Sequence, residues 1–132
     1  MFKIGDKISY TTTVTDKMVN QFAEMSGDFN PVHMDEEYAK GTRFGKRIAH
    51  GMISGALISR TLATDLGPGG IYLGQSMKFV NPIFIGDIVT VDLIVKSMRE
   101  KSGIALIETN VTKSTGEICV KGEATIMAAA NL

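Results

Sequence analysis

One apolar helical segment followed by a run of strand patterns constrains the fold of this chain more than any other feature. Residues 50–65 carry apolar side chains around most of a helical circumference, which is typical of a helix that lies inside a protein. After the turn at residues 67–70, apolar and polar residues alternate with the period of two that indicates β-strands. Short turns between these strands favour antiparallel pairing. The simplest fold that satisfies both patterns is α+β, with a curved antiparallel sheet against one long buried helix.

The alternating segments predict five strands, the first of which precedes this helix. Residues 7–14 alternate and contain many β-branched side chains, as strands do. Each of the four later strands is expected to present one face, made by the following residues: Leu73, Gln75, Met77 and Phe79; Val89, Val91, Leu93 and Val95; Ala105, Ile107, Thr109 and Val111; Ile118, Val120, Ala124 and Ile126. Cys119 lies among polar neighbours on the last strand and is interpreted as an unremarkable thiol.

A short amphipathic helix is predicted directly after the first strand. Thr15 is a suitable N-cap residue, and the charge of Asp16 suits the first turn of a helix. Apolar residues then recur at helical spacing, namely Met18, Val19, Phe22 and Met25. Gly27 and Pro31 cannot continue this helix, so we expect it to end at about Ser26 and to be followed by a stiff loop.

The size and charge of the chain exclude several classes of protein. With 132 residues, it is long enough for one domain and too short for two, so we expect a single domain over residues 1–132. Its 14 basic and 14 acidic residues cancel, which argues against a nucleic acid partner. No uncharged apolar run approaches the ~20 residues of a membrane-spanning helix, and the single cysteine excludes an internal disulfide. We therefore expect a soluble, cytoplasmic protein with no membrane partner.

The segment between the two helices carries the residues best suited to chemistry. Asp28, Asn30 and His33 bring a carboxylate, a carboxamide and an imidazole within six residues, on a loop stiffened by Pro31. An imidazole titrates near neutral pH, and a carboxylate can hold or activate a water molecule. The same residue types also cap helices and build turns, so the spacing alone leaves a purely structural role open.

A second candidate feature is the start of the apolar helix. Free N–H groups at a helix N-terminus can stabilise a developing oxyanion, and Gly51 would permit close approach. The alternative is that His50 only caps the helix and that Gly51 only packs. Gly51, Gly55 and Ser59 also form a stripe of small side chains, which suits either tight packing on the sheet or a path for a ligand.

Four segments of the sequence resemble the MaoC-like, (R)-specific enoyl-CoA hydratases. They are residues 22–33 (FAEMSGDFNPVH), 49–59 (AHGMISGALIS), 72–79 (YLGQSMKF) and 82–87 (PIFIGD). The similarity covers essentially the whole chain in the order of the family, and the D-x-N-P-x-H core is specific.

The resemblance implies a hot-dog fold, in which an antiparallel sheet wraps around a long central helix, and a homodimer or higher homo-oligomer. It implies reversible addition of water to a trans-2-enoyl-CoA, giving an (R)-3-hydroxyacyl-CoA with a short acyl chain. Asp28 and His33 match the catalytic pair, and Asn30 matches the residue that fixes the loop. Gly51 matches the backbone donor to the thioester oxygen, and Ser59 matches a serine near the active site.

The substrate contacts and the exact reaction are less constrained. Lys46, Arg47 and Lys78 are candidate contacts for the phosphates of coenzyme A, although each is also suited to a solvated surface. Two other activities stay open, an acyl-CoA thioesterase on the same scaffold and a non-catalytic subunit that binds acyl thioesters. No cofactor is expected, since coenzyme A is part of the substrate. No metal is expected, since the sequence shows no cluster at ligand spacing.

Overall fold

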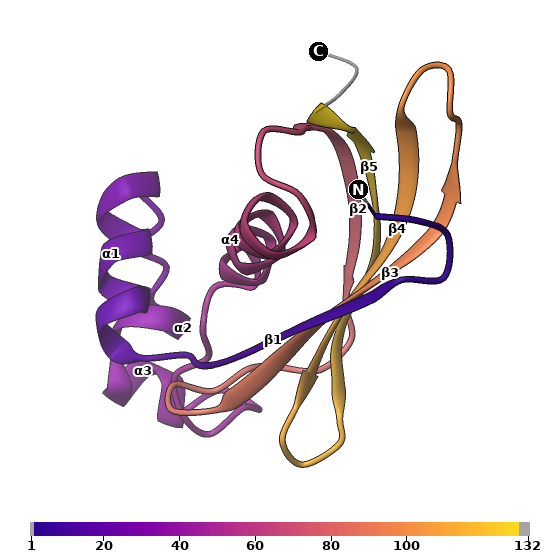
Figure 1. Ribbon diagram of the computed structural model, residues 1–132. Coiled ribbons are helices and arrows are strands. Elements are labelled where there is room, and N and C mark those ends of the chain that lie inside the picture. Colours follow the sequence, from indigo (N-terminus) through magenta and orange to yellow (C-terminus); the bar gives the residue numbers. More distant parts are fainter. Residues whose placement is uncertain (1, 130–132) are drawn as a thin grey trace.

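The computed structural model describes residues 2–129 and has one five-stranded antiparallel sheet with the strand order β1-β3-β4-β5-β2. The strands are β1 (Lys7–Thr13), β2 (Ile71–Phe79), β3 (Ile88–Met98), β4 (Ile104–Lys113) and β5 (Ile118–Met127). The helices are α1 (Asp16–Ser26), α2 (Pro31–Met34), α3 (Glu36–Lys40) and α4 (Gly51–Thr61), and α4 continues as the π-helix η1 (Leu62–Leu66). The helix α4 lies on the concave side of the curved sheet (Figure 1), which confirms the predicted α+β architecture.

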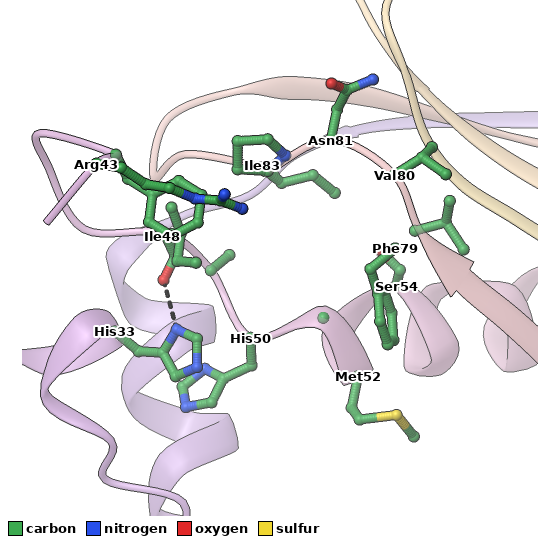
Figure 2. A pocket seen from close by; sticks show the side chains of 15 residues that line it. His33, Arg43, Ile48, His50, Met52, Ser54, Phe79, Val80, Asn81 and Ile83 are labelled. Atoms are coloured by element: carbon green, nitrogen blue, oxygen red, sulfur yellow. Dashed lines mark hydrogen bonds between the residues drawn. The ribbon is translucent and has the colours of Figure 1, made fainter.

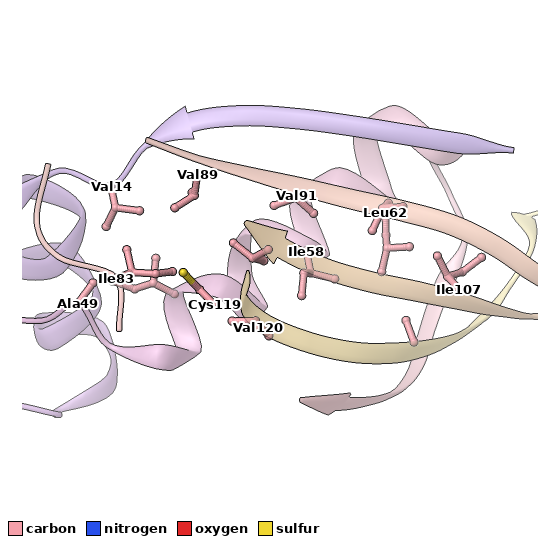
Figure 3. Packing of buried hydrophobic residues seen from close by; sticks show 14 of the residues in the cluster. Val14, Ala49, Ile58, Leu62, Ile83, Val89, Val91, Ile107, Cys119 and Val120 are labelled. Carbon is pink, nitrogen blue, oxygen red and sulfur yellow. The ribbon is translucent and has the colours of Figure 1, made fainter. Parts of the chain in front are cut away.

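The central strands and α4 form the core. The predicted inward faces of β3 and β4 are confirmed, because Val89, Val91, Leu93, Val95, Ala105, Ile107, Thr109 and Val111 are all buried. Ile53, Ile58 and Leu62 from the central helix pack against this surface, as Figure 3 shows for Ile58 and Leu62. β3 and β4 lie inside the sheet, with a strand on each side, and each buries one face.

The edge strand β2 departs from the predicted alternation. Its register shifts between Tyr72 and Gly74, and Leu73, at this irregularity, is 48% exposed. Phe79 is also exposed, as is Ile118 at the start of β5. These three residues lie at an edge or an end of the sheet, where the chain covers their side chains only in part.

Two predictions about helix faces were partly wrong. Val19 is buried in α1 and Phe22 is partly buried, but Met25 is 75% exposed, and Ala23 takes the buried position on this face. In α4, Met52 is 53% exposed, so the helix is not covered on all sides within one chain. A helical repeat of 3.6 residues cannot show which side of an apolar helix has a partner.

Cys119 is part of the core rather than an unremarkable thiol on a polar strand. Its side chain is fully buried, and Figure 3 shows it among Ile83, Ala49 and Val120. Burial is the largest cause that raises the pKa of this thiol, so it behaves as a small apolar side chain. No helix among residues 2–129 is long and apolar enough to cross a membrane.

Candidate active site

The segment from Ser26 to His33 is a sharp turn between two helices, held by its own polar side chains. Gly27 ends α1 in the left-handed region, with φ of 80°, where glycine is favoured. Asp28 Oδ1 accepts a hydrogen bond from the N–H of Asn30 at 3.2 Å, and Asn30 Oδ1 accepts one from the N–H of Val32 at 3.3 Å. Pro31 occupies the first position of α2, where its fixed φ suits a helix.

The sequence predicted a loop after Ser26, whereas the structure has a turn followed by the short helix α2, which begins at Pro31. The carboxamide of Asn30 caps α2, the short helix that carries His33. Asn30 therefore links the turn to the start of α2. Asp28 itself is exposed, with its side chain at the surface of the turn.

The hydrogen bonds of His33 define its tautomer. Its Nδ1 lies 2.8 Å from the carbonyl oxygen of Ile48, which can only accept, so Nδ1 carries the hydrogen and donates it. Figure 2 shows this bond at the wall of a cavity. Burial is the largest cause that lowers the pKa of His33 below its usual 6.5, against the opposing effect of the Ile48 hydrogen bond. The ring is therefore neutral at pH 7, with a lone pair on Nε2.

His50 brings the two members of the predicted catalytic pair together. Its ring centroid lies 4.1 Å from that of His33, with an angle of 34° between the ring planes. Its Nε2 donates to the backbone carbonyl of Asp28 at 2.9 Å. A side-chain oxygen of Asp28 and one ring nitrogen of each histidine all lie within 4.8 Å of one another. Asp28 and His33, five residues apart in the sequence, thus face a common small volume.

A cavity of about 320 Å³ opens beside this cluster at the N-terminal end of α4. Figure 2 shows His33 and His50 on one wall, with Phe79 from β2 on the opposite side. The first turn of α4 begins at Gly51 on this cavity, and the first N–H groups of a helix have no carbonyl partner within the helix. A polarised oxygen bound here would meet these donors and the positive end of the helix dipole.

The stripe of small residues on α4 faces the edge strand β2, and packing accounts for its two glycines. A Cβ atom built on Gly51 would lie 2.8 Å from Cε1 of Phe79, and one on Gly55 would lie 3.2 Å from Cε of Met77. Ser59 is exposed and lines a second, smaller cavity of about 150 Å³. The structure does not bring Ser59 to the cavity that contains His33.

The three basic candidates for coenzyme A contacts have different surroundings. The Arg47 guanidinium donates to the carbonyl of His33 at 2.6 Å and to Asp16 at 2.9 Å, so it ties α2 to α1. The ammonium of Lys46 lies 4.5 Å from the centre of the Phe84 ring. Lys78 is exposed on β2.

Sequence reasoning missed two residues of this site. Arg43 lines the cavity, and the signal that could have found it was the concentration of positive charge between residues 41 and 48. His50 was interpreted as a helix cap, but its side chain makes no capping hydrogen bond. Its actual contacts join segments that are 17 and 22 residues away in the sequence, which no local pattern reveals.

Asp28, His33 and His50 have the donor types of a zinc site, and their ligand atoms lie within 4.8 Å of one another. One nitrogen of each ring already contacts a backbone carbonyl, Nδ1 of His33 that of Ile48 and Nε2 of His50 that of Asp28. In this arrangement only the other nitrogen of each ring is left to bind an ion.

Comparisons with known proteins give a consistent result. Residues 3–117 match the MaoC like domain family. The (R)-specific enoyl-CoA hydratase of Rhodospirillum rubrum is 41% identical over 126 residues, which cover 95% of this chain and 87% of that protein.

Two solved structures share both fold and sequence with this chain. The unliganded R-hydratase of Pseudomonas aeruginosa superimposes with a TM-score of 0.91 and 44% identity, covering 96% of this chain and 82% of the other. The (R)-hydratase of Aeromonas caviae, described as involved in PHA biosynthesis, gives a TM-score of 0.93 and 38% identity, covering 96% and 97%.

Proposed function

This chain belongs to the MaoC-like domain family, and we infer that it is an (R)-specific enoyl-CoA hydratase. It adds water reversibly to a trans-2-enoyl-CoA and gives an (R)-3-hydroxyacyl-CoA. The assignment to particular residues rests on one observation: Asp28 and His33 lie close together beside the N-terminus of α4. His33 and Gly51 line the cavity, whereas Asp28 does not line it and lies within 4.8 Å of a ring nitrogen of His33. A water-binding pair beside an oxyanion site is what this reaction requires.

We propose that the attacking water binds between Asp28 and His33. The Asp28 carboxylate accepts one hydrogen bond from it, and the bare Nε2 of the neutral His33 accepts the other. The oxygen of the water then forms a bond to C3, the C2=C3 double bond becomes a single bond, and negative charge moves to the thioester oxygen. The pair takes one proton from the water and returns a proton to C2. The net reaction is the addition of water, without oxidation or reduction.

The thioester oxygen is proposed to lie against the N–H of Gly51 at the start of α4. Charge grows on this oxygen during the attack, so a donor already in place lowers the barrier. Protons are the only groups that the protein must move, and the proposal therefore needs no metal or cofactor. Coenzyme A enters and leaves as part of the substrate.

The size of the cavity supports a short acyl chain. Its volume of about 320 Å³ is at the lower end of the ~300–1,000 Å³ usual for small-molecule sites. Exposed Lys46 and Lys78 are the proposed contacts for the coenzyme A phosphates, with Arg43 at the cavity wall as a further candidate. Arg47 already has two partners within the chain, so a role for it in this binding would require it to share them.

We also propose a cytoplasmic homodimer. Large apolar side chains are exposed on α4, along β2 and directly after β2, namely Met52, Ile71, Leu73, Phe79 and Val80. β2 is an edge strand, so its outer backbone groups are free to pair with a second chain. A second copy on this face would cover the apolar residues and close the cavity that Met52 and Phe79 line.

The test is the hydration of crotonyl-CoA, measured as loss of enoyl-thioester absorbance, with the product identified by an (R)-specific dehydrogenase. Asp28→Asn and His33→Gln are each expected to lower kcat by about 10²–10⁴-fold. Asp35→Asn is the matched control, because Asp35 caps α3 through the N–H of Tyr38 and asparagine caps equally well.

Three outcomes would count against parts of the proposal. A wild-type protein that hydrates neither crotonyl-CoA nor longer enoyl-CoA thioesters is not this hydratase. Release of free thiol without loss of the double bond would indicate the thioesterase. Tight binding without turnover, unaffected by Asp28→Asn, would indicate a non-catalytic subunit.

A further inference from the structure

We propose that His50 is a positioning residue that holds Asp28 in place against His33, an inference that rests on the proposed hydratase activity. The two histidines of the chain lie at one wall of the cavity (Figure 2). His33 is a member of the proposed catalytic pair, whereas the mechanism above gives His50 no task.

Helix capping does not explain the imidazole of His50. The residue stands at the N-cap position of α4, but its side chain makes no hydrogen bond to the first turn. The ring instead turns away from the helix and lies between two other rings, 4.8 Å from Phe22 and 4.1 Å from His33. A serine or aspartate would cap α4 better, so capping is not what this side chain supplies.

Packing does not explain it either. His50 is only 3% exposed, and its Nδ1 is buried with no hydrogen-bond partner within residues 2–129. Burying an unpartnered nitrogen costs free energy, and a phenyl ring would fill the space between Phe22 and His33 without that cost. What the imidazole adds is the donor at Nε2, which lies 2.9 Å from the carbonyl oxygen of Asp28.

The hydrogen bonds of the turn show why this donor matters more for Asp28 than for His33. His33 and its neighbour Val32 are joined to residues 47 and 48 by three bonds: Ile48 N–H to the Val32 carbonyl, His33 Nδ1 to the Ile48 carbonyl, and Arg47 to the His33 carbonyl. The other hydrogen bonds of Asp28 are local: its N–H donates to the hydroxyl of Ser26, and its carboxylate accepts from the N–H of Asn30. Among the described residues, His50 is thus the long-range hydrogen-bond partner of Asp28.

One side chain therefore connects the three parts of the site. His50 holds the backbone of Asp28 through Nε2, contacts the ring of His33, and precedes Gly51 at the start of α4. Loss of the Nε2 donor would release the Asp28 turn while α2 and His33 remain tied to residues 47 and 48. The distance between the carboxylate and the imidazole would then vary, which slows the chemical step more than it weakens substrate binding.

The experiment compares two amide substitutions in the full-length protein. His50→Gln places an amide N–H₂ near the position of Nε2 and can still reach the Asp28 carbonyl, whereas His50→Asn is one methylene shorter and cannot. We expect His50→Asn to lower kcat for crotonyl-CoA by about 10²-fold, with KM changed little. His50→Gln is expected to recover kcat to within about tenfold of the wild type, because it restores the donor.

Two further variants separate positioning from stability. His50→Phe keeps a ring against Phe22 and His33 but has no donor, so it is expected to keep its melting temperature and to lose kcat as His50→Asn does. If His50 acts through Asp28, then His50→Asn costs little more in a protein that already carries Asp28→Asn.

Equal losses in His50→Gln and His50→Asn would overturn the inference, and so would wild-type kcat in His50→Phe. A full loss from His50→Asn in the Asp28→Asn background would overturn it too, since His50 would then act independently of Asp28. An inactive wild type would overturn the proposed function and this inference together, whereas the other outcomes concern an active wild type.

Discussion

At the scale of a residue, one hydrogen bond determines which ring nitrogen of each histidine acts as the donor. Each ring donates to a backbone carbonyl, His33 through Nδ1 and His50 through Nε2. The two rings therefore use different nitrogens as donors. Nε2 of His33 is assigned to the attacking water, while Nδ1 of His50 has no hydrogen-bond partner among residues 2–129.

The lowered pKa of His33 predicts a dependence of stability on pH. The pKa is about 6.5 in the unfolded chain and lower in the folded one, chiefly because of burial. As pH falls from 6.5 through the lowered value, the unfolded chain takes up a proton that the folded chain does not, so the free energy of unfolding decreases. Urea unfolding between about pH 7.5 and 5.5 should show this decrease.

The control for this effect is the His33→Gln variant, which cannot take up the proton. Its free energy of unfolding should change less over the same pH range than that of the wild type. Parallel pH profiles for the two proteins would contradict the prediction, because the proton uptake would then belong to other groups. A neutral His33 also predicts that kcat/KM falls on the acidic side of the lowered pKa.

At the scale of elements, the contact between α4 and β2 decides the geometry of the cavity. Gly51 lies beneath the ring of Phe79 and Gly55 beneath the thioether of Met77. The two positions differ in how well they would tolerate an added methyl group. The stiff ring of Phe79 can move aside less easily than the flexible side chain of Met77. The two glycines therefore differ in how strictly they are required, although both belong to the same stripe.

We expect Gly51→Ala to destabilise the protein by about 1–3 kcal/mol, as overpacking does. Gly55→Ala should be close to neutral, since alanine favours a helix by up to about 1 kcal/mol over glycine and Met77 can shift. Urea unfolding of both variants measures the difference. Phe79→Leu combined with Gly51→Ala should recover part of the lost stability, and a Gly51→Ala protein as stable as the wild type would show that packing is not the constraint.

For the whole molecule, the two edges of the sheet determine what a second chain can reach. β1 and β2 are the edge strands, and exposed apolar residues gather on β2 and the adjacent side of α4. Ile71 on β2 and Ile88 on the inner strand β3 are equally exposed, at 46% each. They differ in that β4 and β5 separate Ile88 from β2.

These two isoleucines give a matched test of the proposed dimer. Ile71→Lys places a charge on the proposed interface and should shift the protein towards monomers, whereas Ile88→Lys should leave the dimer intact. Light scattering coupled to size-exclusion chromatography measures the mass of each variant. A monomeric wild type would contradict the dimer, and dissociation of both variants would show that the effect is not specific to β2.

Local patterns in the sequence were sufficient for the five strands, for the two longer helices and for the buried faces of the inner strands, but not for α2, where a loop was expected. The alternation of Val89 to Val95 identified the inward face of β3. This strand lies between β1 and β4 inside the sheet, so its apolar face is buried within the same chain. Thr15 accepts from the N–H of Met18 at 3.2 Å, so the predicted start of α1 is correct. The carboxylate, the carboxamide and the imidazole of the D-x-N-P-x-H segment were likewise evident from their spacing.

Only the tertiary structure decided which residues meet at the site and which sides of the elements stay uncovered. His50 reaches Asp28 and His33 through the fold, across 22 and 17 residues, and its choice of nitrogen depends on carbonyls that no local pattern places. Leu73, Met25 and Met52 are apolar at the expected spacing and still exposed. Apolar periodicity reports that a face can be buried, whereas burial itself requires a partner, and the position of that partner is a property of the folded chain.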